Sequence, residues 1–217
     1  MPRSSKIYWS IDLDYWMKLT PIFPREVFDE ILSWQVPIHI VTDHHHLLKY
    51  LRKTEFDVLV NSDHHSDLAE NLIHGKKCGL NEGTWGNFVI GRKNKKFIWH
   101  YPLKMCLSQK SNGGYCHCYK NPFTRYNKYD PKICEWKDVV KRQEFMPREN
   151  DGHIVAVGIS ISSEWTKYTT IEDFTEWCEI AAKEPQVYYP NNLFSVLDKI
   201  INPMVRFRKG RNKSPIF

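Results

Sequence analysis

Three short clusters of acidic and histidine residues carry the side chains of this sequence that could do chemistry. They are the pair Asp12 and Asp14, the Asp-His-His-His segment at 43–46 and the Asp-His-His-Ser-Asp segment at 63–67. Four or more carboxylates gathered with two imidazoles would repel one another, and two divalent cations would relieve that repulsion. We therefore hypothesise a two-metal hydrolytic site, in which ions about 3.5–4 Å apart activate a shared water as nucleophile.

The spacing of the third cluster is its most informative property. Alternate residues of an extended segment point to the same side, so Asp63, His65 and Asp67 can face one point. Mixed oxygen and imidazole ligands suit Mn²⁺ and also Fe²⁺ or Zn²⁺. An isolated Asp-x-Asp pair is typical of a surface loop, and residues 43–46 alone could be a capped helix start. The three clusters together favour metal binding.

Each cluster follows an apolar, β-branched run that predicts a strand. We predict strands at 6–12, 37–42 and 56–62, alternating with helices at 25–34 and 47–52. This alternation favours an α/β fold, a three-layer α/β/α arrangement with a mainly parallel sheet. The carboxyl ends of parallel strands lie side by side and ligands bind there, so we expect the clusters to meet at one edge.

The chain is expected to be a single domain over 1–217, with an irregular insertion rich in cysteine and aromatic residues at about 86–150. Within the insertion, residues 88–90 and 97–101 predict a hairpin. Alternating aliphatic residues predict another strand at 153–162. Two helices follow: one at 170–183, capped by Thr170 with Ile171, Phe174, Trp177 and Ile180 on one face, and one at 191–201, ended by Pro203.

Composition excludes some classes of protein. With 217 residues, 41% hydrophobic and 14% aromatic, the chain can bury a core and is not disordered. No apolar run approaches the roughly 20 residues of a membrane helix, and no signal peptide is visible, so we expect a cytosolic protein without a membrane partner. The net charge of +6 and the basic tail at 206–213 permit a nucleic-acid partner, but a solvated tail is the favoured interpretation. The oligomeric state stays open.

Four of the six cysteines fall in the irregular middle of the chain. Cys106, Cys116, Cys118 and Cys134 could bind a structural zinc ion, but their spacing fits no common zinc finger. Reduced thiols are the favoured interpretation.

These motifs resemble the arginase-type ureohydrolase superfamily. Asp43-His44 is similar to its Gly-Asp-His segment, and residues 63–67 to its Asp-Ala-His-x-Asp segment. Residues 10–14 resemble its Ser-Phe-Asp-x-Asp segment. The resemblance is strongest to a branch of small arginase-like proteins that includes peptide arginases, with DHHxAL, DxHSD and IDLDFF segments. Residues 81–85 and 160–166 also resemble pieces of that branch.

The resemblance implies an arginase- or deacetylase-like fold with two Mn²⁺ ions, or Fe²⁺ or Zn²⁺ in their place. By residue, it implies one ion held by His44, Asp67 and Asp12, and another held by Asp63, His65 and Asp14. Asp67 and Asp12 are the expected bridges between the two ions.

The implied reaction is hydrolysis of a C–N bond of a guanidino group, in a small molecule or in peptide or protein arginine. Asp63 and Glu164 are the expected catalytic residues, and Asn81, Glu82 and Glu164 the expected substrate-binding residues. A guanidinium is permanently charged and needs such carboxylate partners. Two alternatives stay open: a zinc-dependent amide hydrolase such as a deacetylase, and a non-enzymatic basic binding module on a ureohydrolase-like scaffold.

The sequence departs from the family in two ways. The Asp-x-Asp segment comes late in the family and first here, which a circular permutation would explain. In addition, the range 86–150 matches no segment of the family. No residue clearly matches the histidine that moves protons in true arginases, so His74, His100 and His153 are candidates only.

Overall fold

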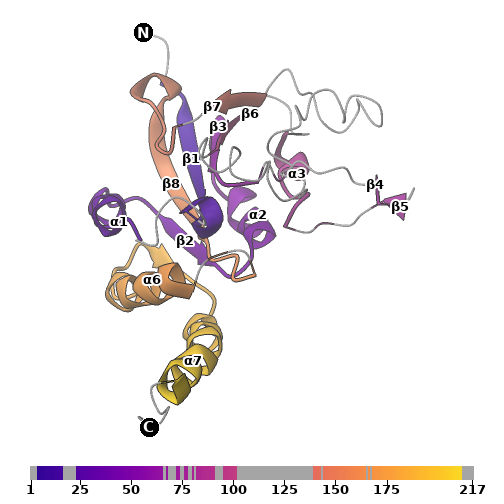
Figure 1. Ribbon diagram of the computed structural model, residues 1–217. Coiled ribbons are helices and arrows are strands. Elements are labelled where there is room, and N and C mark those ends of the chain that lie inside the picture. The colour runs from indigo at the N-terminus through magenta and orange to yellow at the C-terminus, as the bar shows by residue number, and fades with distance from the viewer. Residues whose placement is uncertain are drawn as a thin grey trace.

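A seven-stranded sheet forms the centre of the fold (Figure 1). The computed structural model describes residues 4–16, 23–65, 67, 72–73, 76–77, 80, 82–90, 95–101, 139–142, 144–164, 166 and 168–211. The strand order is β7-β6-β3-β1-β8-β2-β9, and every neighbouring pair is parallel. The predicted α/β class with a mainly parallel sheet is therefore confirmed. The finer three-layer, arginase-like description stays a prediction.

The strands of this sheet are β1 (Lys6–Asp12), β2 (Ile38–Val41), β3 (Val58–Ser62), β6 (Lys96–His100), β7 (Val139–Arg142), β8 (His153–Ser160) and β9 (Val187–Tyr188). A separate antiparallel pair is formed by β4 (Leu72–Ile73) and β5 (Lys76–Lys77). The helices of the described residues are α1 (Arg25–Ser33), α2 (Leu48–Leu51), α3 (Asn87–Ile90), α6 (Tyr168–Ala181) and α7 (Leu193–Arg211). Short 3₁₀ turns are η1 (Leu13–Trp16), η2 (His44–Leu47) and η5 (Glu149–Asp151).

Strand β1 lies in the middle of the sheet and is buried on both faces. In register, Ile11 pairs with Ser62 of β3, and Asp12 pairs with Ser160 of β8. The carboxyl ends of these three strands therefore lie level with one another. A near-continuous apolar run such as that of β1 is what a strand covered on both faces requires.

Two separate hydrophobic cores cover the two faces of the sheet. Alternate residues of a strand point to opposite faces, so Trp9 belongs to one core and Tyr8 to the other. The first core includes side chains of α1, α6 and α7, and the second those of η2, α2 and α3. Figure 1 shows α1 and α6 on one side of the sheet and α2 and α3 on the other.

Aromatic rings fill much of the first core. Phe28 of α1 packs edge-on against Phe174 and Trp177 of α6, with ring centroids 5.9 and 5.3 Å apart. Fully burying one such side chain stabilises a fold by roughly 1.5–3 kcal/mol. This packing fixes α1 and α6 against the sheet and so stabilises the strands that carry the acidic clusters.

The predicted hairpin at 88–101 is wrong. Asn87–Ile90 is a short helix, and Lys96–His100 is a strand that pairs in parallel with β3 and β7. A short apolar run does not distinguish a strand from a buried helix turn, which explains the error. Strands β6 and β7, both inside the expected insertion, extend the central sheet at one edge.

Three smaller expectations about the C-terminal helices are also wrong. Helix α6 begins at Tyr168, so Thr170 is a buried residue of its first turn and not its cap. Ile180 is 50% exposed and does not share the buried face of α6. Helix α7 runs from Leu193 to Arg211, so Pro203 lies inside the helix and does not end it, although an interior proline removes one backbone hydrogen bond. Among the described residues, no helix combines the length and apolarity needed to span a bilayer.

Candidate metal centre

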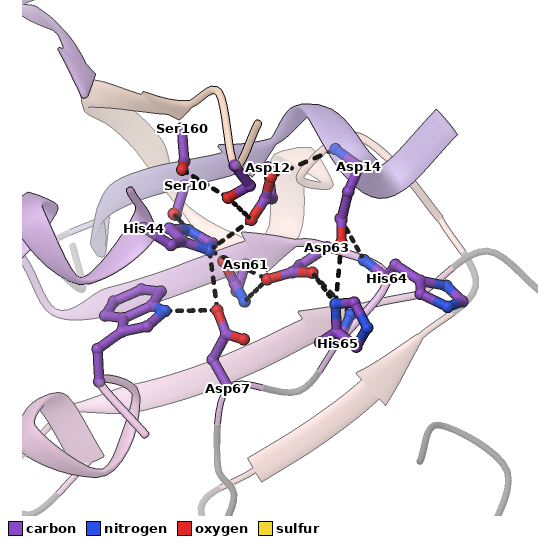
Figure 2. A network of polar contacts seen from close by, with 12 residues as sticks. Ser10, Asp12, Asp14, His44, Asn61, Asp63, His64, His65, Asp67 and Ser160 are labelled. Carbon is purple, nitrogen blue, oxygen red and sulfur yellow. Dashed lines mark hydrogen bonds and ion pairs between the residues drawn. The ribbon is translucent and has the colours of Figure 1, made fainter. Parts of the chain in front are cut away.

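All six side chains predicted as metal ligands meet at the carboxyl ends of the central strands (Figure 2). Asp12 ends β1 and Asp14 lies in η1 directly after it. His44 begins η2, which follows β2, and the remaining three ligands follow β3. Each ligand therefore sits where a rigid buried strand gives way to a turn, so the sheet fixes its starting position.

His44 faces three carboxylates at once. Its Nδ1 lies 3.1 Å from Asp12 Oδ2, 3.1 Å from Asp63 Oδ2 and 2.8 Å from Asp67 Oδ2. Its other ring nitrogen, Nε2, lies 2.7 Å from Ser10 Oγ. A histidine anchored through one ring nitrogen presents the other in a fixed direction, as metal-ligating histidines do.

The second histidine of the site, His65, faces two carboxylates. Its Nδ1 lies 2.9 Å from Asp14 Oδ2 and 3.8 Å from Asp63 Oδ1. The backbone N–H of His65 also donates to Asp63 Oδ1 at 2.6 Å. His65 is only half-buried, whereas His44 is 1% exposed, so His65 is on the more open side of the site.

Among the described residues, two groups of three side chains have ligand atoms that lie within 4.8 Å of one another, Asp12–His44–Asp63 and Asp14–Asp63–His65. Asp63 belongs to both groups. Its Oδ2 faces His44 and its Oδ1 faces His65. The expectation that Asp12 and Asp67 bridge the ions stays a prediction. In the structure, Asp63 is the carboxylate that lies between the two histidines.

Burial and mutual repulsion raise the pKa values of three of the carboxylates. Burial, followed by the charges of Asp67 and Asp12, raises the pKa of Asp63 to about 8. Burial and then the charge of Asp63 raise the pKa of Asp14 to about 6. The pKa of Asp12 is also raised, first by burial and then by Asp14. Crowded buried acids that hold protons near neutral pH are poised to exchange them for cations.

The pKa values of the two histidines are raised, whereas burial lowers the pKa of an ordinary histidine. Burial alone would lower the pKa of His65, but the hydrogen bond to Asp14 and the surrounding carboxylates raise it to about 10. Against the same burial effect, the charges of Asp67 and Asp12 raise the pKa of His44 well above its usual value. A protonated imidazole at either position would reduce the repulsion among the carboxylates around it, as a bound cation would.

The donor set fits two divalent cations. Asp12, Asp14, Asp63 and Asp67 are all at most 6% exposed. With neutral imidazoles, the four carboxylates carry four negative charges, which equal the charge of two divalent cations. Carboxylate oxygens with one imidazole in each group are a donor chemistry that suits Mn²⁺, Fe²⁺ and Zn²⁺.

Three polar side chains orient the candidate ligands. The sequence analysis did not identify them as functional residues. Ser162 Oγ donates to Asp12 Oδ2 at 2.7 Å, and Ser160 Oγ lies 2.9 Å from Ser162 Oγ. The amide of Asn61 donates to Asp63 Oδ2 at 3.3 Å. These hydrogen bonds hold the carboxylates in place before any ion binds. Their position in the sequence could have indicated this role, because these small polar residues lie at the ends of otherwise apolar strands.

Of the three non-glycine residues with positive φ in the described part of the chain, two lie at this site, and the third, Gln35, follows α1. Asp67 has φ +53° and Ser162 has φ +42°, in the left-handed region that residues with a side chain rarely adopt. Such a conformation costs of order 1–3 kcal/mol and persists only where its surroundings enforce it. One of these two residues is a ligand candidate and the other orients a ligand, so the strain lies within the site itself.

Further carboxylates surround the predicted metal ligands. Burial, then the hydrogen bond and charge of Asp43, and then the charge of Glu164 raise the pKa of Glu82 to about 7. Glu82 is half-buried, and Glu164 is exposed in the turn after β8. The structure thus brings Glu82 and Glu164 into the same electrostatic neighbourhood as Asp12. Asn81 lies outside the described residues.

The three histidines named as candidates for moving protons differ in where they lie. His153 is exposed at the start of β8, at the opposite end of that strand from the site. His100 is buried, with Nδ1 3.1 Å from the carbonyl oxygen of Phe145, and burial lowers its pKa. His74 and the cysteines at 106, 116, 118 and 134 lie outside the described residues. Cys178 is a buried free thiol in α6.

Comparison with known proteins adds no assignment. No protein-family model, no curated protein and no solved structure matches this chain. The site therefore stands on its own residues and distances.

Proposed function

We propose that the protein is a dinuclear metal-dependent hydrolase that cleaves a C–N bond of a guanidino group. The observation that carries this proposal is the pair of Asp/His groups sharing Asp63. A site with two ligand groups and a common carboxylate is the arrangement that holds two ions a few ångströms apart. The ureohydrolase resemblance of the three motifs supports the same reaction class.

Each ion would be held by one histidine and by carboxylates from different strands. Asp12, His44 and Asp67 would hold one ion, Asp14 and His65 the other, and Asp63 would contact both. When bound, Mn²⁺, or Fe²⁺ or Zn²⁺ in its place, supplies Lewis acidity and activates water near neutral pH. The four candidate carboxylates are buried, so their charges act in surroundings of low dielectric constant.

The proposed substrate is cationic, because the surroundings of the site are acidic. Glu82 interacts electrostatically with three other carboxylates, those of Asp43, Glu164 and Asp12. A guanidinium presents a planar, permanently charged fork that pairs with carboxylates. Glu82, with its pKa of about 7, can exchange a proton near neutral pH, the property required of a general acid that protonates a leaving amine. Glu164 would hold the substrate from the exposed side.

One observation favours a second candidate, a mononuclear zinc-dependent amide hydrolase. The Asp12–His44–Asp63 group offers three protein ligands, the number that a catalytic zinc site uses. Such an enzyme would bind about one ion per chain where the dinuclear hydrolase binds about two. Metal stoichiometry therefore separates the two proposals.

The test is metal analysis followed by an activity assay. The purified protein is loaded with Mn²⁺ and incubated with free arginine, agmatine and arginine-containing peptides, and urea release is measured. Asp63→Asn should abolish release, while Asp29→Asn, an exposed carboxylate paired with Arg25 on α1, should leave it unchanged.

Two results would contradict the proposal. One is a loaded protein that releases urea from none of these compounds but hydrolyses acetylated amines. The other is salt-dependent nucleic-acid binding that survives Asp63→Asn without any hydrolysis, which would favour the binding module.

A further inference from the structure

Trp85 contacts two of the candidate ligands from outside the ligand set. Its indole Nε1–H donates a hydrogen bond to Asp67 Oδ2. Its ring also packs against the imidazole of His44, with centroids 4.5 Å apart and planes tilted by 44°. Trp85 is fully buried, so its indole has no freedom to turn away from these two side chains.

The backbone beside Trp85 holds the same residue. The N–H of Gly86 donates to the backbone carbonyl of Asp67 at 3.0 Å. Asp67 is thus held at both its carboxylate and its main chain by two adjacent residues. This pair of bonds accounts for the left-handed backbone of Asp67, φ +53°, in a residue that is not glycine.

The carboxylate that Trp85 holds is the one nearest His44. Asp67 Oδ2 lies 2.8 Å from His44 Nδ1, closer than the oxygens of Asp12 or Asp63, and Figure 2 shows the two side chains pointing toward each other. An indole N–H pointing at one carboxylate oxygen occupies one of its lone pairs and leaves the others free for a cation. The donor also helps to neutralise a buried charge.

We infer that Trp85 is a positioning residue of the metal centre: its indole N–H sets the Asp67 carboxylate, and its ring sets the His44 imidazole, in the geometry that binds the ion. This inference rests on the proposed dinuclear site. The indole offers no metal-ligand atom, so Trp85 would act through its two neighbours, Asp67 and His44. Hydrogen-bonding partners of metal ligands are worth about 10–100-fold in metal affinity.

The test uses Mn²⁺ alone as the probe, with free Mn²⁺ measured by electron paramagnetic resonance. In the full-length protein, Trp85→Phe keeps an aromatic ring and removes the donor, so the dissociation constant should rise about 10–100-fold. The matched control is Trp177→Phe. Trp177 is equally buried in α6, and its Nε1 has no hydrogen-bond partner among the described residues, so the affinity should stay unchanged. Circular dichroism checks that both variants fold.

A double-variant cycle separates this role from a structural one. In the Asp67→Asn background the carboxylate is already lost, so Trp85→Phe should then weaken Mn²⁺ binding by less than about threefold. If Trp85→Phe does not fold, replacing the indole with the isosteric benzothiophene removes only the N–H, and the same loss of affinity is expected. Wild-type affinity in a folded donor-less variant overturns the inference alone. Absence of Mn²⁺ binding by the wild-type protein overturns the proposed function with it.

Discussion

Asp12 Oδ2 lies 3.1 Å from His44 Nδ1, although strand β8 runs between the strands that carry them. The two side chains meet beyond the end of β8, where the small side chains of Ser160, its last residue, and Ser162, two residues later, lie. The N-terminal Asp-x-Asp segment therefore reaches the histidine cluster despite its early place in the chain. The sheet order, and not the chain order, determines which ligands can share an ion.

Substitution of the shared carboxylate should remove both ions, and substitution of a histidine only one. Asp63→Asn should lower the metal content from about two Mn²⁺ per chain to near zero, because both ligand groups lose a member. His65→Ala should leave about one ion, held by the group that contains His44. Plasma emission spectrometry after dialysis measures both contents. Equal metal contents in the two variants would contradict the assignment of Asp63 as the bridge.

Substitution of Ser162 should weaken metal binding more than substitution of Ser160. Ser162→Ala removes the donor to Asp12 Oδ2, so Mn²⁺ affinity should fall about tenfold. Ser160→Ala is the matched control, since it deletes the same atom one hydrogen bond further from the ligand, and its effect should be smaller. Isothermal titration calorimetry reports both. A larger loss in Ser160→Ala would show that the chain of hydrogen bonds does not work as described.

Stability of the metal-free protein should fall as pH rises from 6.5 to 8. In this window the unfolded chain has lost the carboxyl proton of Asp63, while the folded protein, with a pKa of about 8, still holds it. The folded state therefore binds more protons, and rising pH favours unfolding. The raised pKa values of His44 and His65 act in the same direction. His39, whose pKa burial and the charge of Lys49 lower to about 4, is neutral in both states over most of this range.

Urea denaturation at the two pH values measures this trend. Asp63→Asn should flatten it in part, and saturating Mn²⁺ should reverse it, because metal binding displaces the same protons and strengthens as pH rises. A metal-free protein that grows more stable between pH 6.5 and 8 would contradict the raised pKa values.

Packing under η2 should be sensitive to a single added methyl group. A Cβ on Gly158 of β8 would lie 2.8 Å from both terminal methyl carbons of Leu47 and 2.9 Å from Tyr8 Cε1. Leu47 ends the turn that begins with His44, so Gly158→Ala should destabilise the protein by about 1–3 kcal/mol. Chemical denaturation measures the change. In a Leu47→Ala background the penalty should shrink, because the shortened side chain leaves room, and an unchanged penalty would assign the clash elsewhere.

The parallel sheet and the candidate ligands could be predicted from the sequence, because both follow from short local patterns of residues. The apolar runs before Asp12, Asp43 and Asp63 specify buried strands, and parallel strands bring their carboxyl ends together. Which carboxylate lies between the two histidines was not predictable, because it depends on the rotation of Asp63 at the end of β3. The contribution of Trp85 depends on a contact across 18 positions in the chain, which spacing does not encode.

The edge of the sheet escaped prediction for another reason. Residues 96–100 carry an apolar run that pairs with β3 across more than thirty positions, and β7 joins it from further still. Local turn signals at 91–95 favoured a hairpin, but tertiary pairing determined the outcome. The exposed Ile180 is a similar case. Helical spacing indicates which residues share a face of the helix, but not how far along that face they are buried.

Anomalous diffraction at the manganese edge, from crystals grown with Mn²⁺, would locate the bound ions themselves. We expect two anomalous peaks about 3.5–4 Å apart, with Asp63 oxygens beside both. One peak should lie next to His44 and the other next to His65. No peak among these six side chains, or a single peak that leaves His65 and Asp14 without an ion, would contradict the proposed dinuclear site.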